Sequence, residues 1–212
     1  MDWQPPHRAE RRALCDLALA LGPGAPTLCE GWDAERLVGH LWVREHDPVA
    51  AAGIVVPALA DRHEVGIDRA VARHGFTGLV QRVRSGPPAL LRPLDAAINT
   101  VELFVHHEDL RRGDGTAGPR SPLEVQSTEA ALWSRLPRLA PLLTRDLGEV
   151  GLVLRAPGLG EVTAHRRGTG ATLVGRPGEL VLYLYGRRDA AHVEVEGSAA
   201  DRTALAEASL GL

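Results

Sequence analysis

The chain of 212 residues contains no lysine, and all 24 of its basic residues are arginine. Without lysine, Schiff-base chemistry and lysine nucleophiles are excluded anywhere in the sequence. There are two cysteines, Cys15 and Cys29, which are too few for a disulfide framework and do not form a CxxC motif. This cysteine usage favours a reduced, cytoplasmic setting.

Excess positive charge and long apolar runs are also missing. The net charge is -3 at pH 7, so no overall field attracts nucleic acid or an anionic membrane. The apolar run after Arg12 is interrupted by Asp16, and no run approaches the length of a membrane span. We therefore expect a soluble cytoplasmic protein with neither nucleic acid nor membrane as a partner.

Start and stop signals predict a helical first part. Helices are expected from Pro5 or Pro6 to Gly22, from Ala34 to Asp47 behind an N-cap at Asp33, from Arg62 to Val83, from Pro93 to Gly113, and from Ser121 to Leu143. Residues 49–60 are expected to form a loop with a short turn. Pro137 and Pro141 are expected to kink or split the last helix.

The pattern changes after Gly151. The runs GLVLRAPG and EVTAHRRG predict a hairpin, HVEVEG alternates like a strand, and Ser198 with Asp201 predicts the cap of a short helix. The run PGELVLYLY fits either a helix or a buried strand. The fold class is therefore α+β, with a helical bundle over residues 1–147 and a small α+β domain over residues 148–212.

The central helix, Pro93 to Gly113, carries the most informative side chains. Glu102 and His106 are four residues apart and share one helix face with Asn99. A carboxylate and an imidazole on an apolar face cost desolvation energy unless a partner offsets it. A divalent metal ion is a partner that suits both groups.

A third ligand has to come from another helix, and His40 is the best candidate. It lies in the middle of its predicted helix between the core-type residues Leu37 and Leu41. The predicted metal ligands are thus His40, Glu102 and His106. A metal-free core in which these three side chains hydrogen-bond to one another remains the alternative. His7, His63 and His74 are expected at the surface, His46 in a polar cap, and His107 behind the ligands or at the surface. Cys29 is expected to be a buried, inert thiol.

Three segments resemble one known family. LCEGWDAERLVGHLWVRE and NTVELFVHHEDLRRG resemble the two helix signatures of the mycothiol-dependent maleylpyruvate isomerase family, a branch of the DinB/YfiT-like metalloenzyme superfamily. GRPGELVLYLYGR resembles the start of that family's smaller C-terminal domain. The resemblance implies a four-helix bundle followed by a domain like that of sterol carrier proteins.

The resemblance also implies a chemistry. The family's divalent metal ion, usually zinc, is held by residues that match His40, Glu102 and His106. Mycothiol is the implied thiol cosubstrate, and the implied substrate is a small electrophile or carboxylate. The family's isomerase uses an arginine of the C-terminal domain on its acidic substrate, which maps onto Arg187, with Arg188 and Arg176 as alternatives. The activity expected is an S-transferase or a maleylpyruvate-type cis-trans isomerase.

Two other functions fit the same ligands. Two histidines and one carboxylate also bind iron in non-haem oxygenases, although those enzymes usually place them on a β-barrel. A non-enzymatic metal-binding or regulatory module, with the small domain as a ligand carrier, is the other alternative. A structural zinc ion would need a fourth side chain, for which His107, His46 and Cys29 are the candidates.

Overall fold

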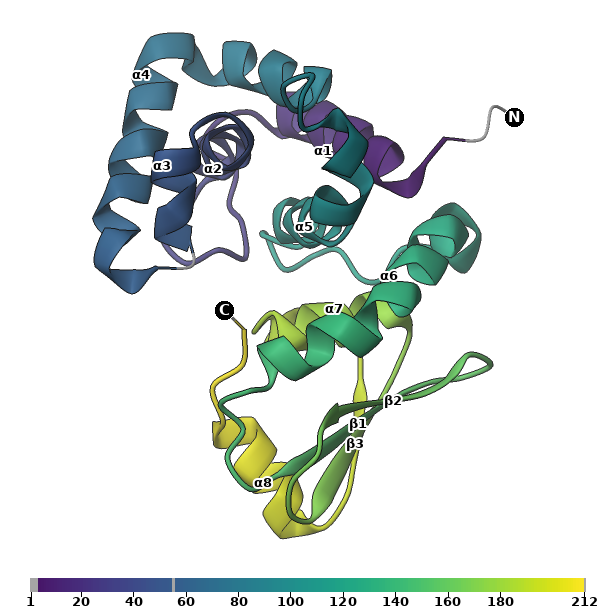
Figure 1. Cartoon of the computed structure of the whole chain (residues 1–212). Coiled ribbons are helices and arrows are strands. Elements are labelled where there is room, and N and C mark those ends of the chain that lie inside the picture. Colours follow the sequence, from purple (N-terminus) through teal and green to yellow (C-terminus); the bar gives the residue numbers. More distant parts are fainter. Residues whose placement is uncertain (1–3, 55, 212) are drawn as a thin grey trace. The chain divides into compact units, whose positions relative to one another are not determined.

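The computed structural model describes residues 4–54 and 56–211, except for the side chain of Pro57. The chain divides into two compact units, Met1–Ala117 and Gly118–Leu212. Figure 1 shows helices throughout the first unit and a sheet with accompanying helices in the second. The predicted α+β class is confirmed.

The first unit contains the helices that the sequence signals predicted. They are α1 (Pro6–Leu21), α2 (Ala34–His46), α4 (Ala60–Ser85) and α5 (Asp95–Arg111), with a short α3 (Pro48–Ala51) and single 3-10 turns at Ala52–Ile54, Pro57–Leu59 and Arg92–Leu94. The Asp33 carboxylate accepts a hydrogen bond from the Arg36 amide at 3.0 Å, which confirms the predicted cap of α2. The direction of α4 changes at Gly75, where φ is 62°. Glycine adopts this conformation without the steric cost that a Cβ would add.

An apolar core holds these helices together. α2 packs against α4, and α1 packs against α4 and α5. The fully buried side chains at these contacts include Leu14, Leu37, Ile67, Leu79 and Leu103. In the described part of the chain, no helix is both long and apolar enough to cross a membrane. α2 and α5, in contrast, face each other through polar side chains, among them His40, Arg44 and Glu102.

The loop between α1 and α2 is attached to the end of α5. The Leu28 amide donates to the carbonyl oxygen of Asp109 at 3.0 Å. At Gly113, just after α5, the backbone lies against Pro26 and Thr27 so closely that a Cβ would run into the Pro26 carbonyl oxygen. Only glycine allows this approach, and the approach places Cys29 beside His106 and Asp109 of α5.

Gly113→Ala is therefore expected to lower the free energy of unfolding by about 1–3 kcal/mol, because the added methyl group meets rigid backbone. Urea unfolding measures this change. The matched control is Gly24→Ala in the loop between α1 and α2, since a Cβ at Gly24 meets nothing within 4 Å. Equal stability of the two variants would contradict the expected clash.

The second unit is built on a sheet with strand order β2-β1-β3-β4 in the described residues. β1 (Gly151–Ala156) and β2 (Gly160–His165) form the predicted hairpin, β3 (Gly170–Val174) runs parallel to β1, and β4 (Glu194–Glu196) pairs with β3. The ambiguous PGELVLYLY run is helix α7 (Pro177–Leu184), and Ser198 caps α8 (Ala199–Glu207) as predicted. The sequence reading did not predict β3.

Helix α6 (Pro122–Leu143) begins with the predicted capping box and continues as one helix through Pro137 and Pro141, so the expected split does not occur. It packs against α7 and β2. Glu129 accepts a hydrogen bond from the Gly178 amide at 2.7 Å, and Thr144 donates to the Ala164 carbonyl at 2.9 Å. These contacts group α6 with the sheet, so the division falls after residue 117 and not near residue 147 as expected.

Candidate metal centre

The three predicted ligands meet between α2 and α5. His40 lies in the middle of α2, while Glu102 and His106 lie one turn apart on α5. One ligand-type atom from each of the three lies within 4.8 Å of the other two. Glu102 Oε1 is 3.5 Å from His40 Nε2 and 3.2 Å from His106 Nε2. Each imidazole therefore directs its own Nε2 atom at Glu102 Oε1.

His63 determines which nitrogen of His40 is free. His63 Nδ1 lies 3.2 Å from the carbonyl oxygen of Ala50, which can only accept, so this nitrogen donates. Burial lowers the pKa of His63, and in its neutral form Nε2 accepts a hydrogen bond from His40 Nδ1 at 2.8 Å. Burial also lowers the pKa of His40 to about 4. The Nε2 lone pair of His40 therefore points toward Glu102, as a metal ligand requires.

Asp109 contacts Nδ1 of His106, as His63 contacts Nδ1 of His40. Its carboxylate is fully buried and lies 3.0 Å from His106 Nδ1. The Cys29 thiol donates to the same carboxylate oxygen at 3.1 Å. A buried carboxylate on Nδ1 fixes the ring and leaves Nε2 to face the ion.

Glu102 is ionised in this setting. Burial opposes the charge, but the hydrogen bond with His106 and the positive charge of Arg44 outweigh it, so the pKa of Glu102 lies well below its usual value. Arg44 Nε is 3.4 Å from Glu102 Oε1, and the same guanidinium donates to the Asn99 side chain and to the Ile98 carbonyl. Arg44 thereby holds the carboxylate toward the two imidazoles.

In the absence of an ion, a proton balances this carboxylate. Burial disfavours the His106 imidazolium, but hydrogen bonds to Asp109, Cys29 and Glu102 outweigh burial and raise the pKa of His106 well above its usual value. The proton on Nε2 then lies between His106 and Glu102, where a cation would bind. Metal binding would release this proton, which is the usual coupling between metal affinity and pH.

The His106 imidazole also belongs to a second group of side chains that could hold a metal ion. Cys29, His106 and Asp109 place one ligand-type atom each within 4.8 Å of one another, on the Nδ1 side of the ring. Cys29 is half-buried and in contact with polar groups, so the expectation that this thiol is buried is wrong. The signal for this group in the sequence is the i, i+3 spacing of His106 and Asp109.

The other histidines require corrections. His63 and His7 were expected at the surface, but both are buried, with 5% and 6% of their surface exposed. His107 is buried and pairs with Glu10 at 2.7 Å. His46 stacks on Trp42 and contacts its carbonyl oxygen. Neither His107 nor His46 belongs to a possible metal-binding group in the described part of the chain.

A buried polar network continues from the candidate centre toward α1. Asn99 donates to Glu45 at 2.9 Å and to Asp95 at 2.7 Å. Both carboxylates contact the Arg11 guanidinium, at 2.6 Å and 2.9 Å. Because Asn99 also accepts from Arg44, hydrogen bonds and ion pairs connect Arg11 with Glu102.

Each candidate arginine of the second unit makes contacts within that unit. Arg176 donates to the Arg120 carbonyl and to Glu129 at 2.7 Å and 2.8 Å. Arg188 donates to two carbonyls of the C-terminal segment and lies over the Tyr183 ring. Arg187 is half-buried in the turn after α7 and donates to the Tyr185 carbonyl at 2.6 Å.

Replacing His63 tests the orientation of His40. His63→Phe removes the acceptor for His40 Nδ1, and we expect the affinity for zinc to fall by about 10- to 100-fold. His63→Gln offers a carbonyl oxygen in place of the lost acceptor and should recover part of this loss. Competition with a chromophoric chelator measures the affinity, with the exposed His192→Phe as a control. An unchanged affinity in folded His63→Phe would contradict the role.

The donor set fits a divalent ion of the zinc type. Two imidazole nitrogens and one carboxylate oxygen converge, and a hydrogen-bonded partner lies behind each imidazole. The assignment depends on this geometry alone, because no family model, no curated protein and no solved structure matches the chain.

Proposed function

We propose that the chain is a metal-dependent enzyme that uses a low-molecular-weight thiol, mycothiol, as an S-transferase or a maleylpyruvate-type cis-trans isomerase. Zinc would be held by His40, Glu102 and His106, and the first unit would be a DinB-like bundle. The single observation that carries the proposal is the convergence of two Nε2 atoms on one ionised carboxylate, at 3.5 Å and 3.2 Å. The resemblance of the two helix segments supports the choice of thiol chemistry.

Three protein ligands leave one coordination position for a small molecule. When bound there, a divalent ion would favour the thiolate form of an incoming thiol at neutral pH. Glu102 has the most exposed side chain of the three ligands, at 17% compared with 6% and 8% for His40 and His106. A cosubstrate would therefore approach past Glu102, while His63 and Asp109 hold the imidazoles from behind.

The two activities differ in the fate of the thiol. In the isomerase, the sulfur adds to a carbon–carbon double bond, the new single bond rotates, and elimination restores the double bond and the thiol. In the transferase, the sulfur displaces a leaving group and remains on the product. Arg187 would bind a substrate carboxylate in a bidentate manner, with Arg188 and Arg176 as alternatives. The second unit would be a small domain like that of sterol carrier proteins.

The test combines metal content with turnover. We expect protein purified without added metal to contain about one zinc ion per chain by mass spectrometry. It should also turn over maleylpyruvate or an activated aryl halide only when mycothiol is present. Both properties should be lost in Glu102→Gln, which keeps the size of the side chain, and kept in His192→Ala. Substoichiometric metal in both the wild type and Glu102→Gln would remove the proposal.

A second function has a specific observation in its favour. Cys29, His106 and Asp109 could hold an ion on the Nδ1 side of the ring, as in a structural or regulatory metal module. In that case Cys29→Ser would lose the metal and Glu102→Gln would keep it. Stoichiometric metal without thiol-dependent turnover would favour this function over the enzyme.

A further inference from the structure

A cavity of about 480 Å³ lies on the first unit, away from the three candidate ligands. It is formed by α1, the end of α4 with the turn that follows, and the segment leading into α5. Arginines dominate its described lining, with one carboxylate among them: Arg8, Arg11, Arg12, Arg84, Arg92 and Asp95. Arg8, Arg11 and Arg12 share one face of α1 because they are three and four residues apart.

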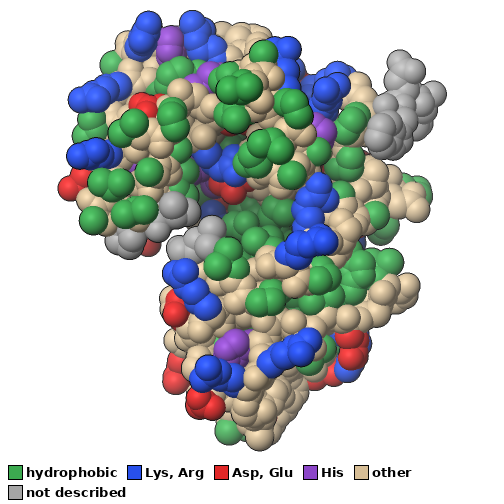
Figure 2. Space-filling view, viewed as in Figure 1, with side chains coloured by type: hydrophobic (Ala, Val, Ile, Leu, Met, Phe, Trp, Pro, Cys, Tyr) green, Lys and Arg blue, Asp and Glu red, His purple; other side chains and the backbone are tan. Residues whose placement is uncertain are grey.

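Among the described residues, part of this positive charge has no carboxylate to balance it. Arg84 pairs with Asp16 at 2.7 Å, and Arg11 pairs with Glu45 and Asp95. Among the described residues, no carboxylate pairs with Arg8, Arg12 or Arg92. The whole chain carries a net charge of -3, and Figure 2 shows arginines scattered over the visible face without forming a continuous patch. The excess of positive charge at this cavity is therefore local.

Arg11 gives the cavity a fixed, buried base. Only 4% of its surface is exposed, and its two terminal nitrogens are bound to Glu45, Asp95 and the Val83 carbonyl. Its Nε is buried and has no hydrogen-bond partner in the described part of the chain. Because Nε is inaccessible, Arg11 forms the floor of the cavity, and a ligand would meet the exposed guanidinium groups of Arg8, Arg12 and Arg92.

We propose that this cavity binds a small polyanion that carries phosphate or carboxylate groups. The planar guanidinium group matches both kinds of oxyanion through paired hydrogen bonds. The volume lies in the range of small-molecule sites and exceeds what a single inorganic phosphate fills. Three arginines without a carboxylate partner among the described residues suit a ligand with two or more negative groups, and the overall negative charge of the chain argues against a nucleic acid.

Calorimetry on the full chain tests the proposal with pyrophosphate and tricarballylate as the two probes. We expect saturable binding of one molecule per chain for at least one probe, and the tighter probe identifies the chemistry. The triple variant Arg8→Gln, Arg12→Gln, Arg92→Gln should bind at least about tenfold more weakly. All three side chains are exposed, so these substitutions should not unfold the protein.

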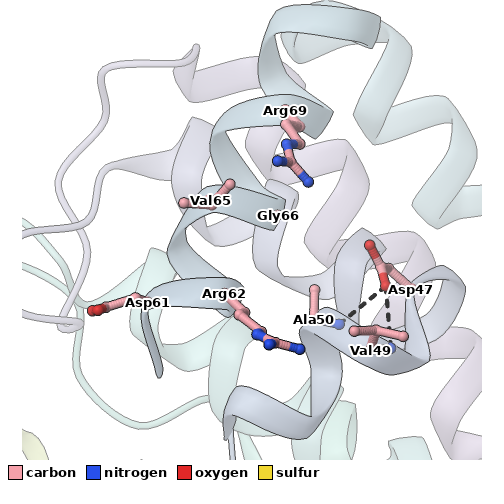
Figure 3. Close-up of a pocket in the computed structure, with 8 residues that line it drawn as sticks. All are labelled: Asp47, Val49, Ala50, Asp61, Arg62, Val65, Gly66 and Arg69. Carbon is pink, nitrogen blue, oxygen red and sulfur yellow. Dashed lines mark hydrogen bonds between the residues drawn. The ribbon is translucent and has the colours of Figure 1, made fainter. Parts of the chain in front are cut away.

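A second cavity supplies the matched control. This cavity has a volume of about 530 Å³. Figure 3 shows its lining, in which the charged residues are two arginines and two aspartates: Arg62, Arg69, Asp47 and Asp61. Arg62→Gln with Arg69→Gln should leave the affinity unchanged, and so should Glu102→Gln, which removes a candidate metal ligand. The proposal would be overturned if Arg62→Gln with Arg69→Gln lost as much affinity for the probe as the triple variant, or if Glu102→Gln lost affinity. The absence of saturable binding at millimolar concentrations of both probes would also overturn it.

Discussion

Replacing Arg11 with methionine is expected to lower the free energy of unfolding by about 3–5 kcal/mol. The guanidinium is the shared cationic partner of Glu45 and Asp95, and all three side chains are buried. Methionine fills a similar volume but leaves two carboxylates close together in a medium that solvates them poorly. Urea unfolding at neutral pH measures the change.

Arg36→Met is the matched control for this prediction. Arg36 also contacts two carboxylates, those of Glu64 and Asp68, but these are 48% and 63% exposed. Exposed ion pairs contribute about 0–1 kcal/mol. If the two variants lost the same free energy of unfolding, the buried ion pairs of Arg11 would contribute no more to stability than exposed ones.

Zinc is expected to stabilise the wild-type protein by about 2.7 kcal/mol at a free concentration one hundred times its dissociation constant. The increment arises because the ion binds the folded centre and not the unfolded chain. In Glu102→Ala the increment should vanish, since the carboxylate toward which both imidazoles point is gone. Thermal unfolding with and without zinc measures this difference for each variant against its own metal-free state.

Cys29→Ser separates the two possible groups in the same measurement. If zinc binds His40, Glu102 and His106, the serine variant keeps most of the increment, because Cys29 lies on the other side of the His106 ring. If the increment instead persists in Glu102→Ala and vanishes in Cys29→Ser, the ion binds on the Nδ1 side.

The helices could be predicted because their ends carry local signals. Asp33 caps α2, Ser121 with Glu124 forms the capping box of α6, and Gly22 follows the last residue of α1. Each signal acts within one turn of chain, so tertiary structure changes it little. The pairing of Glu102 with His106 could be predicted for the same reason, because the two residues lie on one helix.

Features that depend on distant segments were missed. His63 stands between Arg62 and Glu64, which makes the local sequence look exposed, but the short helix α3 brings the Ala50 carbonyl to it. β3 was missed because its partner in the parallel pair, β1, lies about twenty residues earlier. In α2, packing buries Val38, Val43 and Glu45 in addition to Leu37, His40 and Leu41.

The buried network around Arg11 could not be read from the sequence at all. Arg11 and Arg12 look alike in the sequence, yet Arg11 is buried and Arg12 is exposed. The partners of Arg11 come from α2 and from the start of α5, more than thirty residues away in each case. Such pairs form only when three helices have already come together.

The attachment of the first loop to the end of α5 has a consequence for how the first unit opens. The Leu28 amide and the close approach at Gly113 join a segment without regular structure to the most buried helix of the unit. Local fluctuations in proteins release segments that have few such attachments. Residues 22–33 should therefore stay closed until α5 itself detaches, so that loop and helix separate from the rest as one cooperative piece.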